Sequence, residues 1–225
     1  MIDAGEVIEE IRDDINEVDD EIRHHSYPGI FQDQRADEED LIPFVATEYY
    51  IAQSDLRSFA KMIQRFGEDP ETRDFFYGIY QGEDVAVNGL FHLADKLGLS
   101  EEWLKDYDLS ARGFSYASFV AWSAEYASAG EVATAILVNF GAWGHNCGRI
   151  RDSLEDDYGY TEDDTVYFAT FADLDPFVEQ TKKILQEDLD KGLSPRKVLR
   201  TARLYQSYEK MFWDEMSRRC STQIK

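Results

Sequence analysis

Apolar residues that recur at alternating intervals of three and four are the feature that most constrains the fold of this chain. The first such series comprises Ile8, Ile11, Ile15, Val18 and Ile22, with charged residues elsewhere in the same segment. This spacing places the five side chains on one face of a helix. Similar series follow along the chain, whereas the alternation typical of strands is hard to find. The sequence therefore predicts an all-α protein.

Capping and breaking residues indicate where the helices begin and end. We expect helices over residues 3–25, 40–66, 70–96, 101–107, 114–128, 130–156 and 195–221. A further helix should start near Thr161 and Asp164, which resemble a capping box, and should be interrupted at Asp175–Pro176 before it ends at Gly192. The connections are short, and no stretch resembles an interdomain linker. We therefore predict one domain, residues 1–225, of about seven long helices.

The formal net charge of −23 limits the partners that the protein can bind. Such a charge repels nucleic acid and anionic membranes, so neither is expected as a partner. Residues 1–40 alone hold fifteen acidic side chains against three arginines. Two interpretations stay open: a solvated acidic face that keeps the protein soluble, or adaptation of a halophilic protein to high salt. The low number of lysines, nine, favours the second.

The sequence also gives an expectation for localisation. No apolar run approaches the roughly 20 residues that span a bilayer. The first residues are acidic, whereas a signal peptide begins with basic residues. Cys147 and Cys220 do not form a disulfide framework. These observations predict a cytoplasmic protein.

A carboxylate interrupts the apolar face of the last predicted helix. That face comprises Val198, Ala202, Tyr205, Glu209, Phe212 and Met216. A carboxylate that points into a protein core must be paired, bound to a ligand or protonated, because an isolated buried charge is too costly. Glu209 is therefore the leading candidate for an acid or base in a functional site.

The second predicted helix carries two further carboxylates on its apolar face. The series is Val45, Glu48, Ala52, Asp55, Phe59 and Met62. Glu48 and Asp55 could lie at the edge of the face and pair with an arginine or a tyrosine. Alternatively, they join Glu209 in a polar pocket within the helical core, where carboxylates anchor ligands or transfer protons.

The segment 139–148 is rich in residues that disfavour helix, although the pattern around it is helical. Three of its residues are glycines, which let another helix or a ligand approach closely. Asn139 and Trp143 are four residues apart and share a face. An amide beside an indole suits a flat heteroaromatic ligand, and two packed core residues would show the same pattern. His145 and Cys147 fit a surface histidine and a small buried hydrophobic residue.

The four histidines give little support for a metal centre. Helix-bundle di-iron sites use two Glu-x-x-His pairs. Only Glu21 and His24 have this spacing, and they lie at the end of the acidic first predicted helix, on a face expected to be exposed to solvent. We therefore expect no metal and no cofactor.

Several segments together resemble the TenA/THI-4 family, also called thiaminase II. The most specific is Tyr208-Glu209-Lys210-Met211-Phe212-Trp213-Asp214, near the C-terminus. The segments 49–61, 94–100 and 131–138 also resemble the family, in the family's order. The resemblance begins near residue 40 and implies a haem-oxygenase-like all-α fold, usually without haem, and a homodimer or homotetramer.

The resemblance also implies roles for particular residues. The family hydrolyses thiamin-derived aminopyrimidines, using a cysteine nucleophile, a proton-transferring glutamate, and an aspartate and tyrosines that hold the pyrimidine. The glutamate corresponds to Glu209, and the cysteine position falls on Asn139. Two tyrosine positions fall on Trp143 and Phe171. The aspartate falls near Ser54 or Asp55.

These correspondences imply a divergent member that keeps the pocket and lacks the nucleophile, because asparagine cannot supply a thiolate. The leading hypothesis is a protein that binds a small heteroaromatic, aminopyrimidine-type molecule and hydrolyses it with Glu209 as acid or base. The residues expected to bind the ligand are Asp55, Glu48, Asn139, Trp143, Phe171 and Tyr205. Two alternatives stay open: a non-catalytic ligand-binding or regulatory protein, and a metal-dependent oxidase that uses carboxylates such as Glu48, Glu83 and Glu209.

Overall fold

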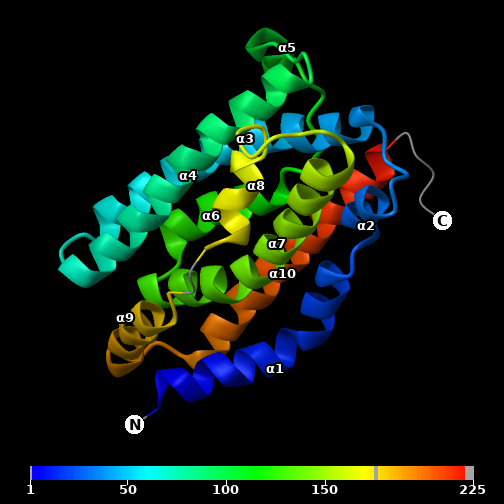
Figure 1. Cartoon of the computed structure of the whole chain (residues 1–225). Coiled ribbons are helices and arrows are strands. Elements are labelled where there is room, and N and C mark those ends of the chain that lie inside the picture. Colours follow the sequence, from blue (N-terminus) through cyan, green and yellow to red (C-terminus); the bar gives the residue numbers. More distant parts are fainter. Residues whose placement is uncertain (1, 175–176, 221–225) are drawn as a thin grey trace.

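The computed structural model describes residues 2–174 and 177–220, and the regular secondary structure of these residues is helical throughout (Figure 1). Seven of the described helices have twelve residues or more, which confirms the prediction of about seven long helices. The elements are α1 Ala4–Arg23, α2 Ser26–Gln32, the 3-10 helix η1 Glu38–Leu41, α3 Ile42–Phe66, α4 Pro70–Lys96, α5 Glu101–Lys105, α6 Ser115–Tyr126, α7 Ala129–Asp157, α8 Val166–Ala172, α9 Val178–Asp190 and α10 Pro195–Arg219.

Local hydrogen bonds explain where several of these helices begin. The side chain of Asp69 accepts a hydrogen bond of 2.7 Å from the backbone N–H of Thr72 at the start of α4. Ser128 and Glu131 form a reciprocal capping box at the start of α7. Each cap satisfies backbone donors that a helix leaves unpaired in its first turn.

The sequence analysis was wrong about the segment that follows α1. The first helix was expected over residues 3–25 and the next over residues 40–66, yet Ser26–Gln32 between them form α2, which includes Pro28 and Gly29. His25 caps this helix, because its Nδ1 accepts a hydrogen bond of 3.2 Å from the backbone N–H of Tyr27. Pro28 falls in the first turn, where a backbone N–H has no helical partner and its loss costs little.

The prediction for the segment after α7 also needs correction. Thr161 and Asp164 form the expected reciprocal hydrogen bonds, but these close a turn, and α8 begins only at Val166. The predicted interruption at Asp175–Pro176 lies outside the described residues. The structure has two helices in this region, α8 and α9, of seven and thirteen residues.

The helices pack around a central pair, α7 and α10, which contact each other along their length (Figure 1). The N-terminal helix α1 packs on both of them. The adjacent helices α3 and α4 pack together, with α6 against α3 and α8 against α4. The predicted apolar faces of α3 and α10 are buried, and so are the carboxylates on them.

Two glycines let the short helix α8 approach its neighbours closely. A Cβ atom at Gly89 of α4 would lie 2.6 Å from the backbone nitrogen of Tyr167, and one at Gly144 of α7 would lie 2.6 Å from the carbonyl oxygen of Phe171. Any larger residue would push α8 outward. The expected role of the α7 glycines in close approach is thus confirmed at Gly144, and it brings Tyr167 and Phe171 into the protein core.

Candidate functional site

A cavity in the protein core is lined by side chains of α3, α4, α6, α7, α8 and α10. It has about 40 Å³ of free space, enough for a few water molecules. All of its lining residues are described, and they include four carboxylic acids but no lysine, arginine, histidine or cysteine. They are Glu48, Ile51, Asp55, Phe59, Glu83, Tyr116, Asn139, Phe140, Trp143, Tyr167, Phe171, Glu209 and Phe212.

Aromatic rings form much of the cavity wall. Trp143 packs edge-to-face against Phe171, with ring centroids 5.9 Å apart, and against Phe212 at 5.5 Å. Such contacts stabilise the orientation of each ring. The cavity therefore offers flat apolar surfaces beside its carboxyl groups.

Glu209 is held from two sides by neighbouring donors. Trp213 donates a hydrogen bond of 3.0 Å from Nε1 to Oε1 of Glu209, and Asn139 donates a short hydrogen bond from Nδ2 to Oε2. Burial raises the pKa of Glu209 to about 8, although both hydrogen bonds oppose the rise. The carboxyl group thus has a fixed orientation and holds its proton to a higher pH than an exposed glutamate does.

Asn139 connects Glu209 to other polar groups of the core. Its Oδ1 accepts a hydrogen bond of 2.8 Å from the hydroxyl of Tyr116, and its Nδ2 also donates to Oε1 of Gln206 at 3.2 Å. Gln206 in turn donates to Asp19 of α1. Asn139 is therefore the centre of a buried hydrogen-bond network that fixes Glu209 in place.

Glu48 and Asp55 lie one above the other on the cavity-facing side of α3. Tyr167 donates a hydrogen bond of 2.8 Å to Oε2 of Glu48, whose pKa burial raises to about 8. Asp55 is only 5% exposed, and its Oδ1 has no hydrogen-bond partner among the described residues. Burial, followed by the nearby Glu83 and Glu48 carboxylates, raises the pKa of Asp55 well above its usual value.

Glu83 of α4 is the fourth acid of the cavity. Its side chain is buried, and within residues 2–174 and 177–220 it forms no hydrogen bond or ion pair. Burial raises the pKa of Glu83 to about 7. Asp55 and Glu83 are therefore the acids whose oxygens are available to a ligand.

The structure brings together most of the residues predicted to form the site. Glu48, Asp55, Asn139, Trp143, Phe171 and Glu209 all line the cavity. Tyr205 does not line it; this tyrosine lies behind the wall, edge-on to Tyr116 with ring centroids 5.5 Å apart. The resemblance placed the family's aspartate near Ser54 or Asp55. Ser54 lines a different groove, whereas Asp55 lines the cavity.

Sequence reasoning missed three polar residues of the site or gave them another role. Glu83 was considered only as a metal ligand, yet it interrupts an apolar series of the same kind as the one around Glu209. The series is Phe76, Ile79, Glu83, Ala86, Leu90 and Leu93, and all six are buried. Tyr116 and Tyr167 carried no comparable signal, because α6 has little apolar periodicity and α8 has only two turns.

Cys147 and His145, which the sequence analysis considered beside Asn139, do not line the cavity. Cys147 is buried outside the cavity lining, and burial raises the pKa of its thiol well above the usual value. His145 is exposed on α7. In the described part of the chain, no group of three or more histidine, cysteine, aspartate or glutamate side chains could hold a metal ion.

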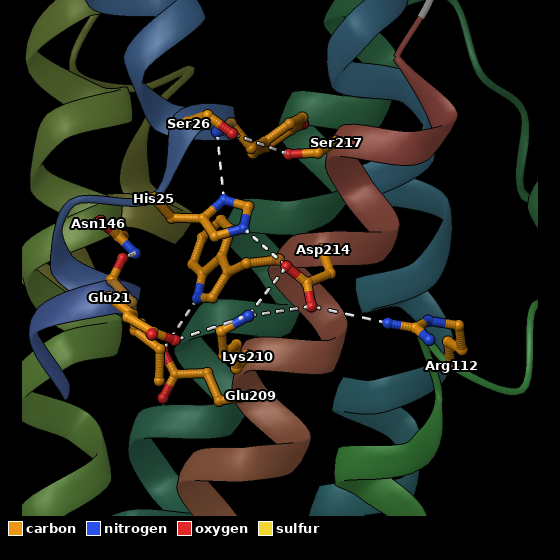
Figure 2. Close-up of polar contacts among 12 residues, drawn as sticks. Glu21, His25, Ser26, Arg112, Asn146, Glu209, Lys210, Asp214 and Ser217 are labelled. Atoms are coloured by element: carbon orange, nitrogen blue, oxygen red, sulfur yellow. Dashed lines mark hydrogen bonds and ion pairs between the residues drawn. The ribbon is translucent and has the colours of Figure 1, made fainter. Parts of the chain in front are cut away.

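A second polar cluster joins α10 to the N-terminal helices. Figure 2 shows His25, Lys210 and Arg112 converging on Asp214, with distances of 3.2 Å, 3.3 Å and 3.6 Å to its carboxylate oxygens. Burial lowers the pKa of His25. None of these residues lines the cavity. The ring of His25 lies beside that of Trp213, with ring centroids 6.4 Å apart, so the cluster adjoins a residue that donates a hydrogen bond to Glu209.

The fold and the site define an all-α protein with a buried cavity lined by acids and aromatic rings. The sequence model of the TENA/THI-4/PQQC family matches residues 12–219. The chain therefore belongs to the TENA/THI-4/PQQC family. A search of curated proteins found no match.

Solved structures of similar proteins agree with this assignment of the fold. A TenA homologue from Pseudomonas syringae pv. tomato is 11% identical, with a TM-score of 0.77 over 92% of this chain and 91% of that chain. A TenA homologue from Pyrococcus furiosus is 18% identical, with a TM-score of 0.73 and coverages of 93% and 99%. A putative TenA-like thiaminase from Sulfolobus solfataricus is 13% identical, with a TM-score of 0.63 and coverages of 96% and 99%. At these low sequence identities, the structural similarity shows that the chain shares the fold of these proteins.

Among the helices of the described residues, none combines the length and the apolar character needed to cross a membrane.

Proposed function

We propose that this protein binds a small heteroaromatic compound that carries a basic nitrogen, of the thiamin-derived aminopyrimidine type. The observation that carries the proposal is the unpartnered Oδ1 of Asp55 in a cavity with four acids and aromatic walls. A protonated amine or amino-substituted ring supplies the positive charge that the lining residues lack and a hydrogen-bond donor for Oδ1 of Asp55. The rings of Trp143 and Phe171 suit a flat ligand. Family membership supports the same class of ligand.

A ligand series that differs only in charge tests this function. A 4-aminopyrimidine with a 5-aminomethyl group should raise the melting temperature, because a ligand at about 100 times its Kd adds roughly 2.7 kcal/mol of stability. The 5-carboxy analogue should give no shift, because no lysine, arginine or histidine lines the cavity to pair with its anion. Asp55→Asn should abolish most of the shift, whereas Asp84→Asn, a change at an exposed position of the neighbouring helix α4, should leave it intact. Equal shifts from the amine and the carboxylate would contradict the proposal.

Hydrolysis of the bound compound is the catalytic form of the same proposal. Water would attack the aminomethyl carbon as the C–N bond breaks. The enzyme would give a proton to the leaving nitrogen and take one from the attacking water, so that the products are an alcohol and ammonia. Glu209, with its pKa raised to about 8, is an acid that can donate this proton. No cysteine lines the cavity, all of whose residues are described, so the water attack would be direct. The non-catalytic alternative keeps the binding step alone and draws support from the hydrogen bonds that engage both oxygens of Glu209.

A turnover assay separates the two forms. Aminomethyl- and formylaminomethyl-pyrimidines should be converted by the wild-type protein and not by Glu209→Gln if the protein is an enzyme. Saturable binding with no release of ammonia or formamide would support the ligand-binding protein and refute the hydrolase.

A further inference from the structure

A groove between α3 and α6 has a lining that is unusual for so acidic a protein. It has about 540 Å³ of free space, against about 40 Å³ in the cavity. All of its lining residues are described, and they include Arg57 and Lys61 but no acid. The chain as a whole has 46 acidic residues against 23 lysines and arginines. We call this hollow the α3–α6 groove.

Arg57 is a cation of this groove that has no partner. Its side chain is exposed, and within residues 2–174 and 177–220 it forms no hydrogen bond, ion pair or ring contact. An arginine partner was considered for Glu48 and Asp55, but Arg57 does not line their cavity. A guanidinium group carries five N–H donors in a planar fork that fits the oxygens of a phosphate or carboxylate. These donors are all available to a ligand.

Further donors of the groove lie one helical turn from Arg57 on either side. Lys61 follows it by four residues, and its Nζ lies 3.3 Å from a carboxylate oxygen of Glu125 in α6, which leaves other N–H donors of Lys61 free. Gln53 and Ser54 precede Arg57 by four and three residues, and both line the groove. Neither of these two side chains has a hydrogen-bond partner among the described residues. Because residues three and four apart share a face of a helix, these side chains gather around Arg57.

Hydrogen bonds to neighbouring segments fix α3 on both sides of the basic residues. Before them, the hydroxyl of Tyr50 donates a hydrogen bond of 2.6 Å to the carbonyl oxygen of Lys105 in α5. After them, Arg65 donates hydrogen bonds of 2.6 Å and 3.0 Å to the carbonyl oxygens of Ala124 and Ala127 at the end of α6. The groove is therefore formed before a ligand arrives, which lowers the entropic cost of binding.

Aromatic side chains line the groove together with these donors. Phe114, just before the start of α6, is half-buried, and so is Tyr50 of α3. The free space falls in the range of pockets that hold small organic molecules, roughly 300–1,000 Å³. The groove therefore has room for a flat ring in addition to an anion at Arg57.

We propose that the α3–α6 groove is a binding site for a small phosphate monoester of an aromatic compound. Arg57 and Lys61 bind the phosphate, and Phe114 contacts the ring. A phosphate monoester has three terminal oxygens and can accept hydrogen bonds from both cations, whereas a carboxylate has only two oxygens. The cavity is unsuited to such an anion, because no lysine, arginine or histidine lines it. The groove is thus a second ligand site, and it does not depend on the proposed function.

Calorimetric titration with phenyl phosphate tests the site. The titration is made at about 0.15 M salt, where screening beyond about 8 Å limits repulsion by the net charge of the protein. Phenyl phosphate should saturate one site per chain. Inorganic phosphate should bind about tenfold more weakly, because it buries no ring. Phenol, which keeps the ring and lacks the anion, should give no measurable binding.

A matched pair of arginine variants locates the phosphate. Arg57→Gln should weaken the binding of phenyl phosphate at least about tenfold, because it removes the charged donors that pair with the phosphate. Arg200→Gln removes the same charge from an exposed arginine of α10 that also has no partner among the described residues. This control should change the affinity less than about twofold. Melting temperatures would confirm that both variants are folded.

A second pair of variants tests the role of Lys61. Glu125→Gln removes the carboxylate that competes with the ligand for Lys61, and it should strengthen the binding of phenyl phosphate about threefold. Glu17→Gln removes the same charge from an exposed position of α1 and should leave the affinity nearly unchanged. Equal gains in both variants would show that only the overall charge of the protein matters, and would overturn the assignment of Lys61.

The remaining outcomes also decide the proposal. An absence of binding by phenyl phosphate at millimolar concentration would overturn it, and so would equal losses in Arg57→Gln and Arg200→Gln. Equal affinities for phenyl phosphate and inorganic phosphate would overturn the contact between the ring and Phe114. Each of these results would leave the proposed function standing, because neither Arg57 nor Lys61 lines the cavity.

Discussion

Asn139 donates a hydrogen bond from its side-chain amide to the carboxyl group of Glu209, and these two residues come from the central helices α7 and α10. The resemblance to the family places a cysteine nucleophile at position 139. In the structure, Asn139 at this position orients the acid. A buried Glu209 is tolerated because Asn139 and Trp213 each donate a hydrogen bond to one of its oxygens.

Replacement of Asn139 by leucine should destabilise the fold by about 3 kcal/mol, because Glu209, Tyr116 and Gln206 would each lose a buried partner. Urea unfolding measures the change. Asn88→Leu is the matched control: Asn88 is an exposed helical residue whose amide bonds only to the backbone of Asp84. It should cost less than about 0.5 kcal/mol. Equal costs for both substitutions would show that the network contributes little.

The position of α8 should depend on Gly89. Substitution to alanine would place a Cβ atom 2.6 Å from the backbone of Tyr167, and we expect a loss of about 1–3 kcal/mol and weaker ligand binding as α8 shifts. Gly78→Ala, on the same helix with open space around its Cβ, should instead stabilise the protein by up to about 1 kcal/mol. Thermal and urea unfolding of the pair provide the measurement. If Gly89→Ala proved as stable as Gly78→Ala, the close packing of α8 would be refuted.

Stability should fall as the pH rises through neutrality. Burial raises the pKa of Glu83 to about 7 and that of Glu48 and Glu209 to about 8, from 4.5 in the unfolded chain. Each acid holds its proton more tightly when folded, so its contribution is complete below pH 4.5 and is lost as the pH rises through the folded pKa.

Substitution of Glu83 by glutamine isolates one of these acids. Between pH 4.5 and about 7, the titration of Glu83 should lower the free energy of unfolding of the wild-type protein by up to about 1.4 kcal/mol per pH unit. The variant should lack this decline. Glu17→Gln, at an exposed position of α1, should keep the wild-type slope. The slopes come from urea unfolding at several pH values. Identical slopes in Glu83→Gln and the wild-type protein would mean that Glu83 is solvated.

The high-salt interpretation of the acidic composition gives a further prediction. With a net charge of −23, repulsion among surface carboxylates should weaken the fold at low ionic strength, and salt should screen it. The melting temperature should therefore rise from low to molar salt, and folded structure should decrease on dialysis into low salt. A melting temperature that is constant over this range would favour the alternative, an acidic face that only keeps the protein soluble.

Particular residues show how far sequence reasoning reached into the site. Glu209, Glu48 and Asp55 were predicted to point inward because each interrupts an apolar series, and all three line one cavity. The same criterion identifies Glu83 within α4. Tyr167 could not be found in this way, because its helix has only seven residues and reaches the core through the contact with Gly89. Tyr205 shares the buried face of Glu209 but lies behind the wall, since helical periodicity distinguishes buried from exposed and not cavity from core.

The sequence by itself determined that the chain is helical, where most of the long helices lie, and that carboxylates enter the core, because these properties depend on spacing within one helix. Only the tertiary structure decided which acids meet and which of them retain free oxygens. Those properties depend on contacts between helices distant in sequence, such as α3 with α4 and α7 with α10. Periodicity along one helix places a side chain on a face, and the neighbouring helices decide what that face contacts.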